Sequence, residues 1–347
     1  MRALRSESEV IKTWKRIFHE PLVSVMCLAY NHQNYIEDAL VGFLIQETNF
    51  PFEVLIHDDA STDRTADIIR EYQAAYPNII KPVYQTENQW SKDKEVIRKA
   101  QYDRVKGVYL AYCEGDDYWT DPSKLQTQVE LLEKNQDINI CFHPVYWFDQ
   151  ENCSIKNTNY GAPGIKKKYT LDELLLYSNF IPTASIVIRK HCIDHQPVWF
   201  DLCIFKDFAM VISAVLTSKN KILMSCMVPM AVYRHHRGGV HSGESEIVNS
   251  LRLLETYKQF ALEPQINKLP AYKRAVKMRK KEYMQALIRG VKFTLIVNSF
   301  YRHKKLISLE DVYKYVIIEY FKCFVTKLKY RIKKIILLHK MCLKLKI

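Results

Sequence analysis

The sequence contains little glycine and lacks the short motifs that mark several large enzyme classes. Only 9 of the 347 residues are glycine, and the patterns GxGxxG, GxxxxGK[ST], GxSxG and HExxH are all absent. Those patterns bind a dinucleotide, cradle a nucleoside triphosphate, present a nucleophilic serine and ligate zinc, respectively. Dinucleotide oxidoreductases, P-loop kinases, α/β-hydrolases and zincins therefore have no positive support.

Paired cysteines and long apolar runs are also missing. The nine cysteines form no CxxC pair and no Cys/His spacing typical of zinc sites, so we expect reduced, mostly buried thiols in a cytosolic protein. No run of roughly 18 apolar residues is present, which argues against a membrane-spanning helix. The first 20 residues are charged and contain no apolar stretch, so they do not resemble a secretory signal.

The sequence does contain enough apolar residues for a globular core, together with an uneven distribution of charge. Hydrophobic residues make up 48% of the chain and charged residues 26%, a balance typical of a folded domain. The net charge is +13, and residues 301–347 hold 13 Lys and Arg against 3 Asp and Glu. The excess positive charge therefore belongs mainly to the C-terminal segment.

Apolar runs alternate with helical patterns over the first 150 residues. Continuous apolar runs predict strands that are buried on both faces, and they occur at residues 22–29, 53–56, 79–84, 107–113 and 138–143. Helical spacing occurs between them, at residues 34–46, 65–76, 92–105 and 122–135. We expect Asp121 to cap the last of these helices, with Pro122 at its first position. This alternation indicates βαβ units and a mainly parallel α/β sheet flanked by helices.

The pattern is looser after Gln150. We predict a loop at residues 151–168, a short helix at 169–177, a strand at 183–189, a helix at 206–218, a strand-like segment at 221–232 and helices beyond Glu244. The chain is therefore expected to have three parts: a lead segment at residues 1–20, an α/β domain at 21–240 with halves at 21–150 and 151–240, and a helical C-terminal region at 241–347.

Three carboxylates are crowded at the end of the fourth predicted strand, in the segment YCEGDDYW at residues 112–119. In open parallel sheets, ligands bind beyond the carboxyl ends of the strands. Adjacent carboxylates repel each other unless a cation neutralises them, and Mg²⁺ is usually held by one or two carboxylates together with substrate phosphates. Glu114, Asp116 and Asp117 therefore indicate either a metal site that bridges to a diphosphate or a solvated acidic turn.

Other polar groups follow neighbouring strands or begin helices. Asp58 and Asp59 end the second strand, where they could accept hydrogen bonds from a base or a ribose, or could form an Asx-turn before the next helix. Asp207 begins the helix at 206–218 and is either a general base or a helix cap. Residues 233–239, YRHHRGG, place basic side chains before a glycine pair. These cations could neutralise a departing diphosphate or lie on a surface loop.

Three of these segments together resemble the family 2 glycosyltransferases. They are PLVSVMCLAYN at residues 21–31, FEVLIHDDASTD at 52–63 and EGDDYW at 114–119, and the resemblance extends over roughly residues 21–240. It implies the GT-A fold, a nucleotide-diphospho-sugar donor, a divalent metal (Mg²⁺ or Mn²⁺) and inversion at the anomeric carbon. Residues 21–150 would then form the nucleotide-sugar half of the domain, and residues 151–240 the acceptor half.

The resemblance also implies roles for residues in the nucleotide-sugar half. Tyr30 and Asp59 would line the nucleoside, with Asp58 beside them. Asp116 and Asp117 match the carboxylates that hold the metal and the diphosphate. Glu114 stands where many family members have aspartate, so it keeps the charge but changes the reach of the carboxylate.

In the acceptor half, the resemblance implies a floor, a base and a closing loop. Thr183–Ser185 resembles the floor of the acceptor site. Asp207 matches the catalytic base, although Lys206 replaces the acid that usually precedes it. A late loop of bacterial members, which would close over the donor, is matched by Tyr233, Arg234, His236, Gly238 and Gly239.

The C-terminal residues 321–347 combine nine Lys and Arg with interleaved apolar residues and no acid. A helix of this kind is typical of segments that lie on a membrane surface, where each basic residue near an anionic leaflet contributes ~1 kcal/mol. The segment could instead pack against its own domain or against a partner protein. We do not expect nucleic-acid binding, because no fold signature for it accompanies the basic tail.

The sequence thus predicts an inverting, metal-dependent glycosyltransferase that moves a sugar from a UDP-linked donor to a saccharide or lipid-linked acceptor in polysaccharide or glycolipid assembly. We expect a cytoplasmic protein that is peripheral at the cytoplasmic face of the membrane. The alternative is a non-catalytic nucleotide-binding or scaffold protein that retains the fold. A nucleotidyltransferase would need a basic triphosphate-binding loop near the first strand, where Tyr30–Gln33 offers little positive charge.

Overall fold

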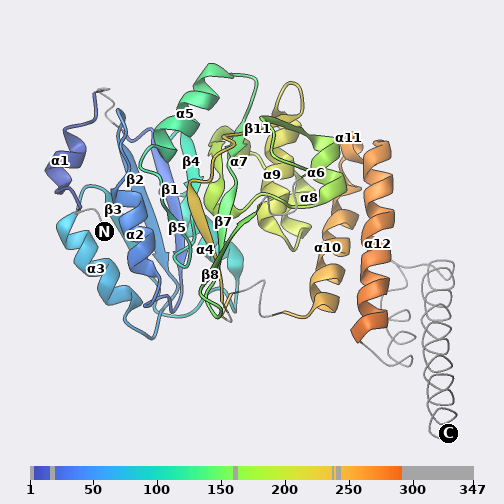
Figure 1. Ribbon diagram of the computed structural model, residues 1–347, viewed down its shortest axis with the longest axis horizontal. Helices are drawn as coiled ribbons and strands as arrows, with labels where there is room; N and C mark the ends of the chain where they lie inside the picture. Colours follow the sequence, from blue (N-terminus) through green and yellow to red (C-terminus); the bar gives the residue numbers. More distant parts are fainter. Residues whose placement is uncertain (1–3, 16–19, 159–162, 237, 240–243, 291–347) are drawn as a thin grey trace, which may run out of the picture. The chain divides into compact units, whose positions relative to one another are not determined.

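The computed structural model describes residues 4–15, 20–158, 163–236, 238–239 and 244–290, which belong to two compact units. The first unit comprises Met1–Asp201 and Lys206–Gly243, and the second comprises Leu202–Phe205 and Glu244–Ile347. Both sheets lie in the first unit (Figure 1). In the second unit, α10 (Glu246–Phe260) and α11 (Pro264–Asn267) each pack against α12 (Pro270–Gly290).

An eight-stranded sheet in the order β3-β2-β1-β4-β10-β6-β11-β9 forms the centre of the first unit (Figure 1). β9 and β10 run antiparallel to their neighbours, and the other adjacent pairs are parallel. The predicted α/β fold with a mainly parallel sheet is therefore confirmed. The strands are β1 (Val23–Ala29), β2 (Phe52–Asp58), β3 (Ile80–Tyr84), β4 (Tyr109–Tyr112), β6 (Ile140–Phe142), β9 (Lys168–Thr170), β10 (Val187–Arg189) and β11 (Ile222–Ser225).

Helices pack on several strands of this sheet, which explains why the strands are mostly buried. Every residue of β2 is buried, and β1 is buried except for Leu28. α3 packs on β3, α4 packs on β2, and α5 and α9 pack on β6. The helices of this unit are α1 (Glu7–Ile11), α2 (Ile36–Leu44), α3 (Thr65–Ala75), α4 (Lys94–Tyr102), α5 (Lys124–Lys134), α6 (Leu171–Tyr177), α7 (His191–Asp194), α8 (Val198–Leu202, which ends in the second unit) and α9 (Lys206–Thr217).

A second, four-stranded sheet has the order β5-β12-β7-β8. Its strands are β5 (Tyr118–Trp119), β7 (Val145–Asp149), β8 (Ser154–Thr158) and β12 (Ala231–His235). β12 pairs antiparallel with β5 and parallel with β7. Because β5 directly follows Glu114–Asp117, this pairing brings the late segment around residue 234 beside the acidic turn.

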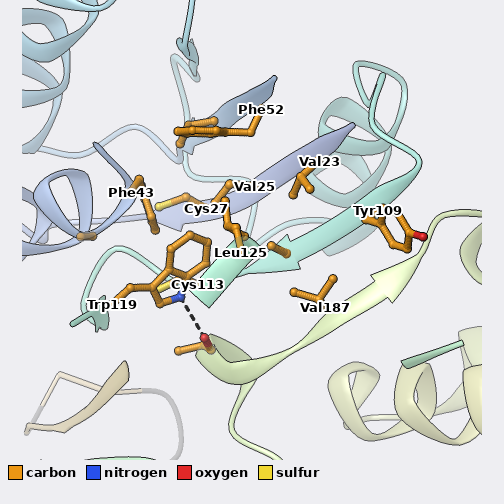
Figure 2. Close-up of a cluster of buried hydrophobic side chains, with 14 of the residues drawn as sticks. Val23, Val25, Cys27, Phe43, Phe52, Tyr109, Cys113, Trp119, Leu125 and Val187 are labelled. Atoms are coloured by element: carbon orange, nitrogen blue, oxygen red, sulfur yellow. Dashed lines mark hydrogen bonds between the residues drawn. The ribbon is translucent and has the colours of Figure 1, made fainter. Parts of the chain in front are cut away.

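Trp119 packs in the hydrophobic core and anchors the end of the acidic turn, residues 114–117. Its ring lies edge-on to Phe43 at 4.9 Å between centroids, and it is 1% exposed. Its Nε1–H donates to the carbonyl of Ala184 at 2.9 Å, within the short 3-10 helix Thr183–Ser185 (Figure 2). A buried tryptophan whose N–H is satisfied contributes several kcal/mol to stability, so the turn before it has a firmly fixed end.

Several local predictions are wrong. The predicted strand at 183–189 is a strand only in β10, because Thr183–Ser185 form a 3-10 helix. β8 lies within the predicted loop at 151–168, because an edge strand that pairs with β7 can be polar and leaves no apolar run. The segment at 221–232 is two strands, β11 and β12, that join different sheets. α5 begins at Lys124, with Ser123 at the N-cap position and without a side-chain cap bond. The carboxylate of Asp121 nevertheless accepts the N–H and hydroxyl of Ser123 at 2.8 and 2.7 Å, as the predicted capping acid would.

The predicted basic helix at 321–347 lies outside the described residues. Within the described ranges, none of the helices has the length and apolar character that a membrane crossing requires.

Candidate active site

The ends of β1, β2 and β4 meet at one edge of the main sheet. The register pairs Ala29 with Asp58, so β1 and β2 end at the same level. The N–H of Asp59 donates to the carbonyl of Ala29 at 2.9 Å, and the N–H of Gly115 donates to the carbonyl of Leu28 at 2.8 Å. The polar segments that follow these three strands are therefore neighbours.

Gly115 makes the close approach of β4 to β1 possible. A Cβ at this position would lie 2.9 Å from Cδ1 of Ile36, 3.0 Å from Nδ1 of His32 and 3.2 Å from Cβ of Ala29. A larger residue would push the acidic turn away from β1, so the glycine is required by space rather than by backbone conformation.

Glu114, Asp116 and Asp117, which we call the acidic strand end, crowd one another in a partly or fully buried position. Burial raises the pKa of Glu114 to about 8, and the carboxylates of Asp116 and Asp207 contribute to the shift. Burial and the charges of Asp116 and Glu114 raise the pKa of Asp117 well above its ordinary value. Burial and mutual repulsion thus disfavour the charged forms of Glu114 and Asp117, a condition that a bound cation would relieve.

Two histidines face the most exposed of these carboxylates, which is that of Asp116. Nε2 of His236 lies 3.1 Å from Oδ2 of Asp116, and Nε2 of His32 lies 3.9 Å from the same oxygen. Although burial acts to raise it, the pKa of Asp116 stays below its ordinary value because of the hydrogen bond with His236 and the charges of both histidines. Asp117 is held differently, because its Oδ1 accepts the backbone N–H of Arg234 at 2.8 Å.

Asp207 lies in the first turn of α9 and is close enough to the acidic strand end for its charge to raise the pKa of Glu114. Nδ2 of Asn179 donates to Oδ2 of Asp207 at 2.7 Å. The neighbouring Lys206 forms contacts elsewhere, with Nζ 3.4 Å from Oε1 of Glu95. The structure thus brings together Asp207 and the acidic strand end, which the sequence had linked only through the family resemblance.

The carboxylates at the end of β2 are occupied by internal donors. Asp58 accepts the N–H of Ser61 at 3.2 Å and its hydroxyl at 2.5 Å, which is the Asx-turn that the sequence left as an alternative. The oxygens of Asp59 accept the N–H groups of Gln89 and Trp90, at 2.8 and 2.9 Å. Asp59 therefore holds the segment that follows β3.

Tyr30 directly follows β1, and its side chain is 43% exposed. The next residue, Asn31, has a left-handed φ of 55°, which asparagine tolerates. Its side-chain oxygen accepts the N–H of Thr62 at 2.8 Å, and its own N–H donates to the hydroxyl of Ser61 at 2.9 Å. The turn that carries Tyr30 is thus tied to the turn that carries Asp58 and Asp59.

The late basic segment is not the surface loop that the sequence left open, because Tyr233, Arg234 and His235 belong to β12. The side chain of Arg234 is only 5% exposed, and its Nη2 lies 2.7 Å from Oδ2 of Asp38. The ring of His236 contacts the carboxylate of Asp116. Arg234 contacts the acidic strand end twice, because its backbone N–H donates to Asp117 and its Nη1 lies 3.1 Å from the carbonyl of Asp116.

Thr183–Ser185, the predicted acceptor floor, makes its described contacts with the core. Ala184 and Ser185 are buried, and their carbonyls accept N–H groups from Trp119 and Gln128, both at 2.9 Å. Its role toward an acceptor stays a prediction.

Sequence reasoning missed four residues that complete this region: His32, Tyr35, Asp38 and Asn179. His32 lies in a polar turn at a strand end, which could have marked it. Tyr35 and Asp38 read as ordinary residues at the start of α2, and Asn179 lies in an irregular segment, so no local pattern distinguishes them.

No group of three or more His, Cys, Asp or Glu side chains is arranged to hold a metal ion in the part of the chain that the structure describes. The predicted set of Glu114, Asp116 and Asp117 therefore does not form a complete protein-only metal site.

Comparison with known sequences assigns the family. Residues 24–195 match the model of glycosyl transferase family 2. An uncharacterized protein of Mycobacterium tuberculosis (strain ATCC 25618 / H37Rv) is 38% identical over 230 residues, which is 65% of this chain and 62% of that protein. The chain therefore spans less than two thirds of this relative. The Escherichia coli enzyme UDP-Glc:alpha-D-GlcNAc-diphosphoundecaprenol beta-1,3-glucosyltransferase WfaP is 24% identical over 239 residues, 68% of this chain and 86% of that enzyme.

Comparison with solved structures supports the fold. TarS residues 1–349 of S. aureus, in complex with UDP-GlcNAc, has a TM-score of 0.53 over 85% of this chain and 78% of its own, at 16% identity. The mannosyltransferase PcManGT of Pyrobaculum calidifontis, in complex with GDP-Man and Mn²⁺, has a TM-score of 0.52 over 84% of this chain and 85% of its own, at 14% identity. At these identities the likeness bears on the fold alone, which is the predicted GT-A fold.

The matched region runs from the second residue of β1 to just past α7. It includes the segments at 52–63 and 114–119 and all but the first three residues of the segment at 21–31. Residues 24–195 of the chain therefore form a domain of glycosyl transferase family 2.

Proposed function

We propose that the protein transfers a sugar from a nucleotide-diphospho-sugar to a hydroxyl group of a saccharide or lipid-linked acceptor, with inversion at the anomeric carbon, in surface-polysaccharide or glycolipid assembly. The main support is that Asp207, the candidate base, lies near enough to the acidic strand end for its charge to contribute to the raised pKa of Glu114. The name of the relative WfaP gives UDP-glucose as donor and a diphosphoundecaprenol-linked sugar as acceptor. It supports a UDP-linked donor and a lipid-linked acceptor here.

In the proposed reaction, Asp207 removes the proton from the acceptor hydroxyl while that oxygen attacks the anomeric carbon. The bond from this carbon to the diphosphate breaks, and its electron pair leaves with the nucleoside diphosphate. Attack from the side opposite the leaving group inverts the configuration. Asn179 orients the base through its hydrogen bond to Oδ2 of Asp207. His32 and His236, beside Asp116, are candidates to donate hydrogen bonds to the diphosphate.

A divalent cation, Mg²⁺ or Mn²⁺, fits the chemistry of the acidic strand end. Carboxylate oxygens are the ligands that these ions prefer, and the pKa values of Glu114 and Asp117 are raised by burial and by the neighbouring carboxylates. Asp116 is the foremost candidate ligand, because its side chain is 21% exposed while Asp117 is occupied by a backbone N–H. A bound cation would neutralise diphosphate charge, and substrate phosphates would complete a set that the protein alone leaves incomplete.

The nucleoside is proposed to lie against Tyr30 and Asp59, with Asp58 holding the turn beside them. Tyr30 can contact a base without rearrangement, because its side chain is exposed. The carboxylate of Asp59 reaches a nucleoside only if it gives up its bonds to Gln89 and Trp90.

We also propose that the protein acts at the cytoplasmic face of a membrane and that residues 321–347 bind anionic lipid. The support is the composition of that segment and the lipid-linked acceptor in the name of WfaP. If a chain without residues 321–347 binds anionic liposomes as well as the full chain, this proposal is wrong.

The substitution Asp207→Asn tests the function. It keeps the shape of the side chain and removes the base, so turnover of nucleotide-sugars should fall by about 10³-fold. UDP or GDP should still bind in the presence of Mn²⁺. The measurement is the release of nucleoside diphosphate from a panel of UDP- and GDP-sugars. Asp201→Asn is the matched control, because Asp201 is 61% exposed and its contacts are with Lys206 and Arg98.

Equal loss of turnover and of nucleotide binding in Asp207→Asn would assign this residue a structural role. A wild-type protein that neither binds nor turns over any member of the panel would favour the non-catalytic scaffold.

A further inference from the structure

Arg234 is buried against three different elements of the first unit. Its Nη2 lies 2.7 Å from Oδ2 of Asp38 on α2, and its Nη1 donates to the backbone carbonyl of Asp116 at 3.1 Å. Its guanidinium lies 4.8 Å from the ring centroid of Tyr35 and 5.0 Å from that of Tyr118. The charge of Arg234 is thus balanced by Asp38 and surrounded by aromatic rings.

The backbone of Arg234 is held as firmly as its side chain. Its N–H donates to Oδ1 of Asp117 at 2.8 Å. Arg234 therefore contacts the acidic strand end at two consecutive residues, through a main-chain donor and through a guanidinium donor. A planar guanidinium with several fixed donors is well suited to set the position of a backbone segment.

His236 follows two residues later and contacts the acidic strand end differently. Its Nε2 lies 3.1 Å from the carboxylate oxygen Oδ2 of Asp116, not from the backbone. The guanidinium of Arg234 thus contacts the backbone of the acidic strand end, whereas the ring of His236 contacts the carboxylate of Asp116.

A direct contact between Arg234 and a diphosphate would require this arrangement to be dismantled. The guanidinium would have to leave Asp38, Tyr35 and Tyr118, and its side chain would have to rise from a position that is 5% exposed. The departure would break the pair with Asp38, whose side chain is 51% exposed, and would release the backbone carbonyl of Asp116.

We infer that Arg234 is a positioning residue: it fixes the acidic strand end through Asp38, Tyr35 and Tyr118 and does not bind the donor diphosphate. This inference rests on the proposed function, because the position of the acidic strand end matters to catalysis only if that turn holds the donor. It replaces the sequence-based expectation that Arg234 neutralises the departing diphosphate.

The substitution Asp38→Ala distinguishes the two roles, because they predict opposite results. If Arg234 acts through Asp38, the affinity for UDP and GDP in the presence of Mn²⁺ falls by about 10-fold, while the affinity for UMP and GMP without metal changes little. If Arg234 binds the diphosphate, loss of Asp38 frees the guanidinium, and affinity stays the same or rises. The measurement is isothermal titration calorimetry.

Two further variants complete the experiment. Arg234→Lys keeps the positive charge but loses the several donors of the planar guanidinium, so it should weaken UDP and GDP binding as Asp38→Ala does. The double variant should bind these nucleotides no more weakly than either single variant. Glu37→Ala is the matched control, since Glu37 lies next to Asp38 on α2 and its carboxylate accepts the hydroxyl of Tyr72 at 3.1 Å. Additive losses, or a loss in Arg234→Lys without one in Asp38→Ala, overturn the inference.

Hydrogen exchange in the ligand-free protein tests the positioning role without a nucleotide. Backbone amides of residues 113–119 should exchange faster in Asp38→Ala and in Arg234→Lys than in wild type and in Glu37→Ala. Unchanged exchange in both variants overturns the inference. If wild type binds no nucleotide, the proposed function fails, and the exchange result still decides whether Arg234 positions this turn.

Discussion

The carboxylates that follow β2 and those that follow β4 lie at the same edge of one sheet but are stabilised in different ways. Both oxygens of Asp59 accept backbone N–H groups, and Asp58 accepts the hydroxyl and N–H of Ser61. After β4, burial and mutual repulsion raise the pKa of Glu114 and of Asp117. The first pair stabilises the turns that shape the site, whereas in the second group burial and repulsion disfavour the charged form of the carboxylates.

The largest effect on stability is expected for Glu114→Gln. The pKa of Glu114 is about 8 in the folded protein and near 4.5 when unfolded, so the folded state binds more protons between these values. Stability is therefore lost as pH rises through this window. Glutamine should remove that loss and stabilise the ligand-free protein at pH 8.5 by on the order of 3 kcal/mol, allowing for partial exposure.

Urea denaturation at pH 4.5 and pH 8.5 measures this difference, which should be nearly absent at the lower pH. Glu71→Gln is the control, because Glu71 is exposed on α3. If the free energy of unfolding of Glu114→Gln depends on pH as that of wild type does, the pKa of Glu114 is not raised in the folded protein. The contrast between the carboxylates after β2 and those after β4 is then wrong.

The substitution Asp59→Asn should have the opposite sign. Asparagine keeps one acceptor oxygen and turns an N–H donor toward a backbone donor, so one of the bonds to Gln89 and Trp90 is lost. We expect a loss of about 2 kcal/mol in the free energy of unfolding at pH 7, with faster hydrogen exchange in residues 85–93.

Asp67→Asn is the control for this prediction, because Asp67 is 64% exposed and pairs only with a residue of its own helix among its described contacts. A stabilising effect of Asp59→Asn would mean that the carboxylate of Asp59 is destabilising in the ligand-free protein, like those after β4. The contrast between the carboxylates after β2 and those after β4 would then be wrong.

Much of the central sheet could be predicted from the sequence because its strands are covered on both faces. β1, β2 and β4 appear as apolar runs followed by polar turns, so their parallel direction and common edge follow from the alternation with helices. β10 could not be placed in this way, since a short buried strand carries no signal of its direction. β8 was missed because a polar edge strand resembles a loop.

The candidate site was predictable where a local motif marked it and not where distant residues meet. Glu114, Asp116 and Asp117 lie within four residues of one another in the sequence, so their mutual repulsion could be predicted. The pair of Asp38 and Arg234 is separated by 196 positions. Asp38 looks ordinary in its own helix, and the sequence suggested Arg234 only as a cation near the diphosphate, so only the fold reveals that Arg234 is buried against Asp38.

The most direct test of the central claim, that the acidic strand end holds a cation together with the donor diphosphate, is the binding of UDP and GDP with and without Mn²⁺ to wild type, Asp116→Asn and Asp59→Asn. Calorimetry should show that Mn²⁺ strengthens nucleotide binding to wild type and to Asp59→Asn, and that Asp116→Asn loses this gain, by about 100-fold in affinity. A gain from Mn²⁺ that persists unchanged in Asp116→Asn would contradict the account.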